Sequence, residues 1–437
     1  MNNHHPLKQR SALALGIMSL CVFGLAAQAQ KNQNFGVFTG YTNGNVSMIF
    51  YGTPGWQYVI QRATNLVQSG TIWVSIATNI FPGSGSITFT DTFSNITPPP
   101  PPYPRAAYYR FQSQTNGPLA NFWNGVEGAW YADAGNLGEQ GEDGFGLGGF
   151  IFPSMLVNAA TSEIWAYYIF HYNGTNFLTG DAEIKSTVGR ARSADTDGVS
   201  WVCDGMVMDV GAAGQWDDQY ASFPGIWKDS NTWYLVYEGA GDGDSANSSP
   251  GDIGLATSTD GLNFVKYPGN PILRHNATGW ENNNIGTPSL YKANGTWYLF
   301  YHGFDGTYCR DGVATGTSLT NLVKYAGNPI IDVASNTSAW DSGTIGRRSA
   351  IAQEGGYYYL AYEGSTPQPY STAQWSSGLA RSTDLFHWTK FSGNPVLPRT
   401  TSGFGYDGPE MIQINGTWYI YVRVNGSEEP EMRFRLQ

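Results

Sequence analysis

One alternation of turn residues and apolar residues recurs four times in the second half of the chain. It first reads Asn231-Thr-Trp-Tyr-Leu-Val-Tyr-Glu-Gly239, and it returns at 295–303, at 356–364 and, in looser form, at 416–423. Each copy is a turn residue followed by an aromatic and aliphatic run, which is typical of a strand entered from a tight hairpin. Recurrence at a fixed spacing predicts a repeat architecture.

Aligning the copies reveals a longer unit. A tryptophan stands eight residues before a shared position that is usually proline, and a Gly-x-Ala phrase and a Gly-Asn-Pro phrase follow the apolar run. The shared position is held by Pro153, Pro224, Pro288, Arg348 and Pro409. Each unit therefore holds four strands, here called A to D in chain order. Four-stranded antiparallel units repeated radially form a β-propeller, and five units fit within 118–437.

The last unit is short, because only Glu431-Met-Arg-Phe-Arg435 follows its strand B. An incomplete blade would leave an unpaired strand edge, which proteins avoid. We therefore predict that Gly128-Ala-Trp-Tyr131 or its neighbours supply the missing strand and close the ring.

The segment 31–115 has a different texture, with short strand-like runs at close spacing that are separated by Gly and Pro. This pattern predicts a small antiparallel β-sandwich. The segment weakly resembles the fibronectin-like accessory modules of secreted bacterial enzymes. Trp56 and Trp73 are candidates for carbohydrate binding, but core packing is the interpretation that we favour for them.

Composition supports an all-β chain, since Gly is abundant (55 residues), aromatics reach 15% and charged residues only 13%. The net charge of −11 argues against nucleic acid or an anionic membrane as a partner. Lys8 and Arg10 precede an apolar run and then Ala27-Gln-Ala29. These features predict a signal peptide over 1–29 and a secreted protein, extracellular or periplasmic. We expect a monomer in which Cys203 and Cys309 are buried free thiols.

The blade phrases Ala256-Thr-Ser-Thr-Asp-Gly-Leu-Asn-Phe264 and Ala380-Arg-Ser-Thr-Asp-Leu-Phe-His-Trp388 resemble those of the five-bladed propeller glycosidases, glycoside hydrolase families 43, 32, 68, 117 and 130. The resemblance covers most of 118–437. It implies a β-propeller that hydrolyses oligo- or polysaccharide by carboxylate acid/base catalysis. The shared phrases are mainly structural, so the reaction is implied less directly than the fold. We assign Asp260 and Asp384 to turns between strands C and D, where Asp accepts backbone hydrogen bonds.

In such propellers the pocket lies on the axis, where strand A begins and strand B ends. Strand B ends at titratable or basic residues that differ from blade to blade: His171, Glu238, His302, Glu363 and Arg423. Asp407-Gly-Pro409 resembles the Glu-Gly-Pro phrase of the general acid in some family 43 members, with Asp for Glu and in the last blade. Blade 1 departs from that family, because Phe152 precedes Pro153 where the general base would stand; Asp143 and Glu142 lie just upstream.

Glycoside hydrolysis by inversion needs one protonated and one ionised carboxyl group. Our catalytic candidates are Asp218, Glu238, Glu363, Asp407 and Asp143, and our substrate-binding candidates are His171, His302, Arg347, Arg348 and Arg423. Glu238 and Glu363 each precede a Gly, so a structural role stays open for both. Arg347 and Arg348 suit a carboxylate or sulfate on a sugar, or they pair with Asp341 or Glu363 within the fold.

We expect no cofactor. Asp242-Gly-Asp244 offers oxygen ligands for calcium but fails the EF-hand pattern, and no zinc motif is present. The expected partner is a carbohydrate substrate. Two other functions stay open: a non-catalytic glycan-binding propeller, and a glycan phosphorylase whose phosphate would bind at Arg347 and Arg348.

Overall fold

The computed structural model describes residues 35–42, 45–51, 57–63, 74–80, 86–92, 108–114, 117–125, 128–135, 137, 146–147, 150–159, 161–176, 179–193, 198–241, 250–367, 373–400, 405–425 and 431–437. The chain forms two compact units, Met1–Gly128 and Ala129–Gln437. The predicted signal peptide, Trp56, Trp73, Asp143 and Asp242-Gly-Asp244 lie outside the described residues.

The first unit is a β-sandwich of two three-stranded sheets. One sheet is β1 (Phe35–Thr42), β2 (Asn45–Tyr51) and β5 (Ser86–Asp91), and the other is β4 (Val74–Ile80), β3 (Gln57–Ala63) and β6 (Tyr108–Gln114). Met48 and Phe50 of the first sheet pack with Ile60 of the second in one buried cluster. A buried ion pair, Arg62 to Asp91 at 2.7 Å, also joins the sheets. The unit includes α1 (Pro118–Trp123), the one helix among the described residues.

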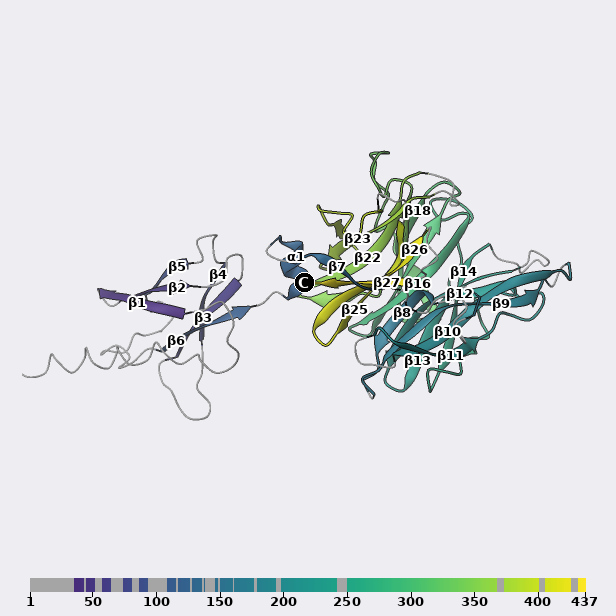
Figure 1. Ribbon diagram of the computed structural model, residues 1–437. Coiled ribbons are helices and arrows are strands. Elements are labelled where there is room, and N and C mark those ends of the chain that lie inside the picture. Colours follow the sequence, from purple (N-terminus) through teal and green to yellow (C-terminus); the bar gives the residue numbers. More distant parts are fainter. Residues whose placement is uncertain are drawn as a thin grey trace, which may run out of the picture. The chain divides into compact units, whose positions relative to one another are not determined.

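The second unit consists of antiparallel strand groups, called blades here and numbered in chain order (Figure 1). Blade 1 is β8 (Ile151–Val157), β9 (Ile164–Thr175), β10 (Ala182–Ser193) and β11 (Trp201–Met208). Blade 2 is β12 (Tyr220–Asp229), β13 (Thr232–Ala240), β14 (Asp252–Ser258) and β15 (Val265–Lys266). Blade 3 is β16 (Asn284–Ala293), β17 (Thr296–Phe304), β18 (Cys309–Ser318) and β19 (Asn321–Lys324).

In blade 4, strand A is interrupted and forms β20 (Thr344–Arg348) and β21 (Ala352–Glu354), followed by β22 (Tyr357–Ser365), β23 (Trp375–Ser382) and β24 (Trp388–Lys390). Blade 5 is β25 (Gly405–Ile414), β26 (Thr417–Asn425) and β27 (Glu431–Leu436), completed by β7 (Trp130–Gly135). The strands A contact one another in a closed cycle, from β8 through β12, β16, β20 and β25 back to β8. An all-β chain with a sandwich before a propeller is therefore confirmed.

The predicted closing strand is also present. β27 pairs antiparallel with β7, from Leu436 opposite Trp130 to Met432 opposite Gly135 (Figure 1). Arg433 forms an ion pair with Asp133 across the two strands. A segment from the start of the unit thus covers the edge that the short last blade would leave open.

The recurrent apolar run is scaffold. Its leucine or isoleucine is fully buried in each copy, at Leu235, Leu299, Leu360 and Ile420. The repeated tryptophan packs on a tyrosine of the same blade, as Trp216 does on Tyr237 with 5.9 Å between ring centroids. The acid that follows this tryptophan accepts a hydrogen bond from the same tyrosine, with 2.9 Å between Tyr237 Oη and Asp217 Oδ2. Because blades 3 and 4 repeat this arrangement, we assign these acids to structure.

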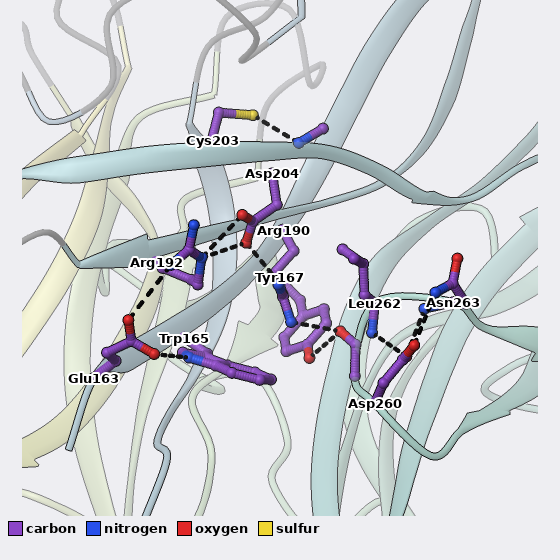
Figure 2. A network of polar contacts seen from close by, with 12 residues as sticks. Glu163, Trp165, Tyr167, Arg190, Arg192, Cys203, Asp204, Asp260, Leu262 and Asn263 are labelled. Atoms are coloured by element: carbon purple, nitrogen blue, oxygen red, sulfur yellow. Dashed lines mark hydrogen bonds and ion pairs between the residues drawn. The ribbon is translucent and has the colours of Figure 1, made fainter. Parts of the chain in front are cut away.

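The turn between strands C and D of blade 2 connects this blade to blade 1 (Figure 2). Asp260 Oδ1 accepts the amides of Leu262 and Asn263, both at 2.8 Å, as expected for a turn residue. The carbonyl of Gly261 in this turn accepts hydrogen bonds from Tyr167 and Arg190 of blade 1. Asp384 repeats the turn contacts of Asp260 in blade 4.

Cys203 and Cys309 are both free thiols, as predicted. Cys309 is buried as expected, whereas Cys203 is only partly buried. Among the described residues there is no helix long and apolar enough to cross a membrane.

Candidate active site

Every strand A breaks its pairing register at the position that the repeated proline marks. The shifts lie at Ile151/Ser154, Ser222/Gly225, Gly286/Ser289, Ile345/Arg348 and Asp407/Glu410. Proline has no N–H to donate to the ladder, so it suits a bulge. A bulge also redirects the neighbouring side chain and amide, which here lie at the axial ends of the strands.

The residue before the proline adopts the left-handed conformation in four blades. The φ angles are 51° at Phe152, 52° at Phe223, 42° at Thr287 and 58° at Gly408. Residues other than glycine rarely adopt this conformation, and each such instance costs about 1–3 kcal/mol. Such strain persists only where the surrounding structure enforces it, which is common at functional sites.

The amides released by these bulges donate to buried carboxyl groups. Thr287 N donates to Glu238 Oε2 at 2.9 Å. Arg347 N and Gly408 N donate to the two oxygens of Glu363, at 2.8 and 2.6 Å. These carboxyl groups thus connect strands A and B around the axis. Glu238 and Glu363 therefore also have a structural role, which the sequence had left open for both.

A cavity of about 430 Å³ opens among these groups. Its carboxyl groups are Glu238, Glu363 and Asp407, and the rest of its lining is aromatic, small or polar: Phe152, Phe223, Asn283, Asn284, Thr287, His302, Phe304, Cys309, Gly346, Trp375 and Arg423. Aromatic faces combined with a few polar groups are suited to a sugar ring. Three predicted catalytic residues therefore lie in one cavity.

Glu363 and Asp407 occupy contrasting environments. Asp407 accepts Nε and Nη2 of Arg423, each at 3.0 Å, and this bidentate pair favours its ionised form. Burial, followed by the nearby charge of Asp407, raises the pKa of Glu363 to about 7. Two carboxyl groups in such different electrostatic environments can divide the acid and base roles at neutral pH.

Glu238 is the third carboxyl group of the cavity. Its Oε1 accepts the hydroxyl of Tyr220 at 2.6 Å, and its Oε2 accepts the Thr287 amide. Burial raises the pKa of Glu238 to about 7, although these two hydrogen bonds act in the opposite direction. No cationic side chain pairs with Glu238 within the described residues.

The other predicted residues are distributed unevenly. His302 and Arg423 line the cavity with the carboxyl groups, whereas His171 and Asp218 do not. His171 Nδ1 lies 2.7 Å from Ser186 Oγ, and burial lowers its pKa. Asp218 is buried and accepts the Gly214 amide at 2.7 Å, just before β12.

Arg347 and Arg348 are buried in the wall behind the cavity and do not line it. Arg347 donates to the Pro153 carbonyl at 2.5 Å, and its ion pair with Glu410 spans 4.0 Å. Arg348 pairs with Asp311 at 2.6 Å. Pairing within the fold is therefore the observed role, but with partners other than the expected Asp341 and Glu363. The support for a phosphate pocket at these two residues is lost.

Several residues at or near the axis were not among the candidates predicted from the sequence, namely Tyr220, Asn283, Asn284, Phe304, Cys309, Glu410 and Glu431. Glu410 and Glu431 are almost fully buried and accept the amides of Met155 and Phe152 of blade 1. One signal was available for Glu410. It follows the repeated proline, where the other units have Ser154, Gly225, Ser289 and Ser349.

No cluster of three or more His, Cys, Asp or Glu residues suited to a metal ion occurs within the described ranges. The calcium candidate lies outside those ranges, so it stays a prediction from the sequence.

No protein-family model and no curated protein matches the sequence. Solved structures do match. An RGII complex of BT0996 has 18% identity and a TM-score of 0.52, covering 71% of this protein and 90% of that one. A glycosyl hydrolase from Bacteroides ovatus has 13% identity and a TM-score of 0.51, covering 71% and 93%. The β-1,2-mannobiose phosphorylase from Listeria innocua, also at 13% and 0.51, covers 71% and 96%.

Similarity at such low identity shows the fold alone. The protein therefore has the β-propeller fold found in these glycan-active enzymes, as the blade phrases predicted. Which reaction the axial cavity supports depends on its own residues.

Proposed function

We propose that this protein is a secreted glycoside hydrolase that cleaves oligo- or polysaccharide in the axial cavity by carboxylate acid/base catalysis, with inversion. The observation that carries the proposal is that Glu363 and Asp407 line one cavity in opposite electrostatic environments. Secretion rests on the charged and apolar pattern of the first 29 residues.

In this mechanism Glu363 is the general acid and Asp407 the general base. Glu363 gives its proton to the glycosidic oxygen as the bond from that oxygen to the anomeric carbon breaks. A water molecule attacks the same carbon from the opposite face and passes its proton to Asp407. The bidentate pair with Arg423 favours the carboxylate form of Asp407 and, because it engages both oxygens, favours proton transfer from water over direct attack on the sugar.

Glu238 has a supporting role in this proposal. The charge of Asp407 acts on Glu363, whereas no neighbouring carboxylate among the described residues acts on Glu238. Through its hydrogen bonds with Tyr220 and Thr287, Glu238 holds the bulge of blade 3 in place. The side chains of Phe152, Phe223 and Trp375 supply the apolar surface for the sugar ring.

The test is a polysaccharide panel assayed with wild-type protein and with Glu363→Gln and Asp407→Asn, following the product anomer by NMR. We expect each variant to lose roughly 10²–10⁴-fold in kcat/KM, the usual contribution of a general acid or base. Asp384→Asn is the matched control, because Asp384 lies in a turn between strands C and D and touches no part of the cavity. Full activity in both cavity variants would refute the assignment.

The rival function is glycan binding without catalysis. It is favoured by one observation: the axial bulge positions of the first three blades hold Phe152, Phe223 and Thr287, which cannot exchange protons at neutral pH. In that case the protein would retain a glycan on an affinity column and release no product from it.

A further inference from the structure

Thr287 is held in the cavity wall by contacts at its amide, its carbonyl and its hydroxyl group. It is β-branched yet has a φ of 42°, an unusual backbone conformation for such a residue. Its amide donates to Glu238 at 2.9 Å, and its carbonyl accepts Nη1 of Arg348 at 3.0 Å. Its hydroxyl oxygen lies 2.8 Å from Nδ1 of His302. These contacts hold the hydroxyl in one place between Arg348 and His302.

Arg348 determines which way that hydroxyl points. Its Nη2 lies 3.4 Å from Thr287 Oγ1, carries part of the positive charge of the guanidinium group, and offers no acceptor to the hydroxyl hydrogen. The same Nη2 is anchored by Asp311 at 2.6 Å and by the Gly346 carbonyl at 3.1 Å. The hydroxyl oxygen therefore faces a fixed positive charge, and the hydroxyl hydrogen points away from it, toward Nδ1 of His302.

The tautomer of His302 follows from this direction. If Nδ1 accepts the hydroxyl hydrogen, the single proton of the neutral ring resides on Nε2. The ring is neutral because burial and the charge of Arg348 lower the pKa of His302 to about 3. Nε2 has no hydrogen-bond partner among the described residues, and His302 lines the cavity.

We propose that Thr287 and Arg348 are positioning residues that hold His302 as the Nε2–H tautomer, so that His302 donates a hydrogen bond to an oxygen of the bound sugar. The sugar part of this inference rests on the proposed function, whereas the tautomer does not.

The tautomer is measured first, without substrate, on the full-length protein labelled with ¹⁵N at histidine. The protein has only 6 histidines, and His302→Gln identifies the signals of His302 in a long-range ¹H–¹⁵N correlation spectrum. We expect Nε2 to be protonated and Nδ1 not. Thr287→Ser keeps the hydroxyl and should keep this pattern. Thr287→Val removes the hydroxyl at nearly equal volume, and the two nitrogens should become more alike as both tautomers are populated.

Sugar binding is measured next, as the Kd for the glycan that the polysaccharide panel identifies. Loss of one well-placed hydrogen bond predicts a roughly tenfold higher Kd for Thr287→Val and His302→Gln, with Thr287→Ser close to wild type. Thermal unfolding of each variant checks that the fold is intact.

A protonated Nδ1 in the wild-type protein would overturn the proposal, and so would a ring spectrum unchanged in Thr287→Val. A wild-type Kd in the folded Thr287→Val protein would overturn the role in sugar binding. If no glycan binds while the tautomer results hold, the proposed function fails and the tautomer assignment stands.

Discussion

Glu363 and Glu410 are both buried glutamates, yet their surroundings differ. Burial raises the pKa of each to about 7. Glu363 lines the cavity, where a proton can pass to a substrate. Glu410 lies behind it, accepts the amides of Met155 and Ala350 at 3.0 and 3.2 Å, and connects blades 1, 4 and 5. A shifted pKa therefore indicates chemistry only together with access to the cavity.

Glu410 should make the protein less stable as the pH rises. Its folded pKa of about 7 exceeds its ordinary value of 4.5, so the folded state binds the proton more tightly. The resulting stabilisation is full below pH 4.5 and is lost as the pH rises through 7. Glu238 and Glu363 act in the same direction. His302 acts oppositely between pH 3 and 6.5, so the carboxyl groups are best observed above pH 6.5.

We expect the free energy of unfolding of the wild type to fall between pH 6.5 and 8, as measured by urea titration. Glu410→Gln cannot ionise, so its slope should be shallower by up to about 1.4 kcal/mol per pH unit. Parallel slopes for the two proteins would show that Glu410 does not titrate in this range.

The sequence identified Glu238 and Glu363 because strand B ends at residues that differ from blade to blade. It identified Asp407 through the resemblance of Asp407-Gly-Pro409 to a phrase of family 43. It did not reveal the partners of Arg347 and Arg348. Glu410 and Asp311 lie in the two neighbouring blades, and only the packing of blade on blade brings them near. Local patterns thus predict which residues face the axis, whereas ion pairing between neighbouring blades depends on contacts distant in sequence.

At the scale of the strand, the bulge in strand A does two tasks. It turns one side chain toward the axis and releases one amide to bind a carboxyl group. The repeated prolines mark where the bulges lie, but the sequence pattern led us to predict strands there and no bulges. Nothing in the local sequence predicted the left-handed conformation of Phe152, Phe223 and Thr287, because bulky residues rarely adopt it.

The bulge of blade 3 needs a glycine at 286. A Cβ atom added to Gly286 would collide with the carboxyl group of Glu238. We expect Gly286→Ala to displace Glu238, to cost about 1–3 kcal/mol of stability and to weaken glycan binding or turnover. Both quantities are measured on the same preparation, by thermal unfolding and by the glycan assay.

Gly295→Ala is the matched control. Gly295 lies in the hairpin of the same blade with a φ of 79°, and an added Cβ would meet no atom within 4 Å. Its left-handed conformation alone predicts a loss of about 1–2 kcal/mol, similar to that of Gly286→Ala. Glycan activity should survive in this variant. Equal activity in the two variants would mean that Glu238 is not held through position 286.

At the scale of the whole molecule, most of the propeller could be predicted because each blade repeats the same short-range pattern. Buried aromatic runs, the Trp–Tyr stack and the turn aspartates recur in several copies. A blade with a weak pattern can therefore still be recognised by alignment with the others. The cavity resists prediction for the opposite reason. The residues at its repeat positions change from blade to blade, and its chemistry arises only where different blades meet.

The closing strand gives a test of how the ring is held. β7 is far from β27 in sequence, yet it pairs along its length and adds the Arg433–Asp133 ion pair. Ala129 and Gln437 extend this pairing at one end, because the amide of each donates a hydrogen bond to the carbonyl of the other. Without β7, the buried backbone groups of β27 would lose their partners, at a cost of about 1–3 kcal/mol for each unsatisfied group.

A shortened protein that begins at Gly128 should therefore unfold at nearly the same temperature as the second unit of the full-length protein, whereas one that begins at Asn136 should unfold well below it. The exposed edge of β27 should also make the shorter protein prone to aggregate, because an open edge pairs with other strands. Differential scanning calorimetry and light scattering measure the two effects. Asp133→Ala in the full-length protein separates the ion pair from the strand and should cost less than removal of β7. Equal melting temperatures for the two shortened proteins would show that the ring is held by its other contacts and that β7 only covers the edge.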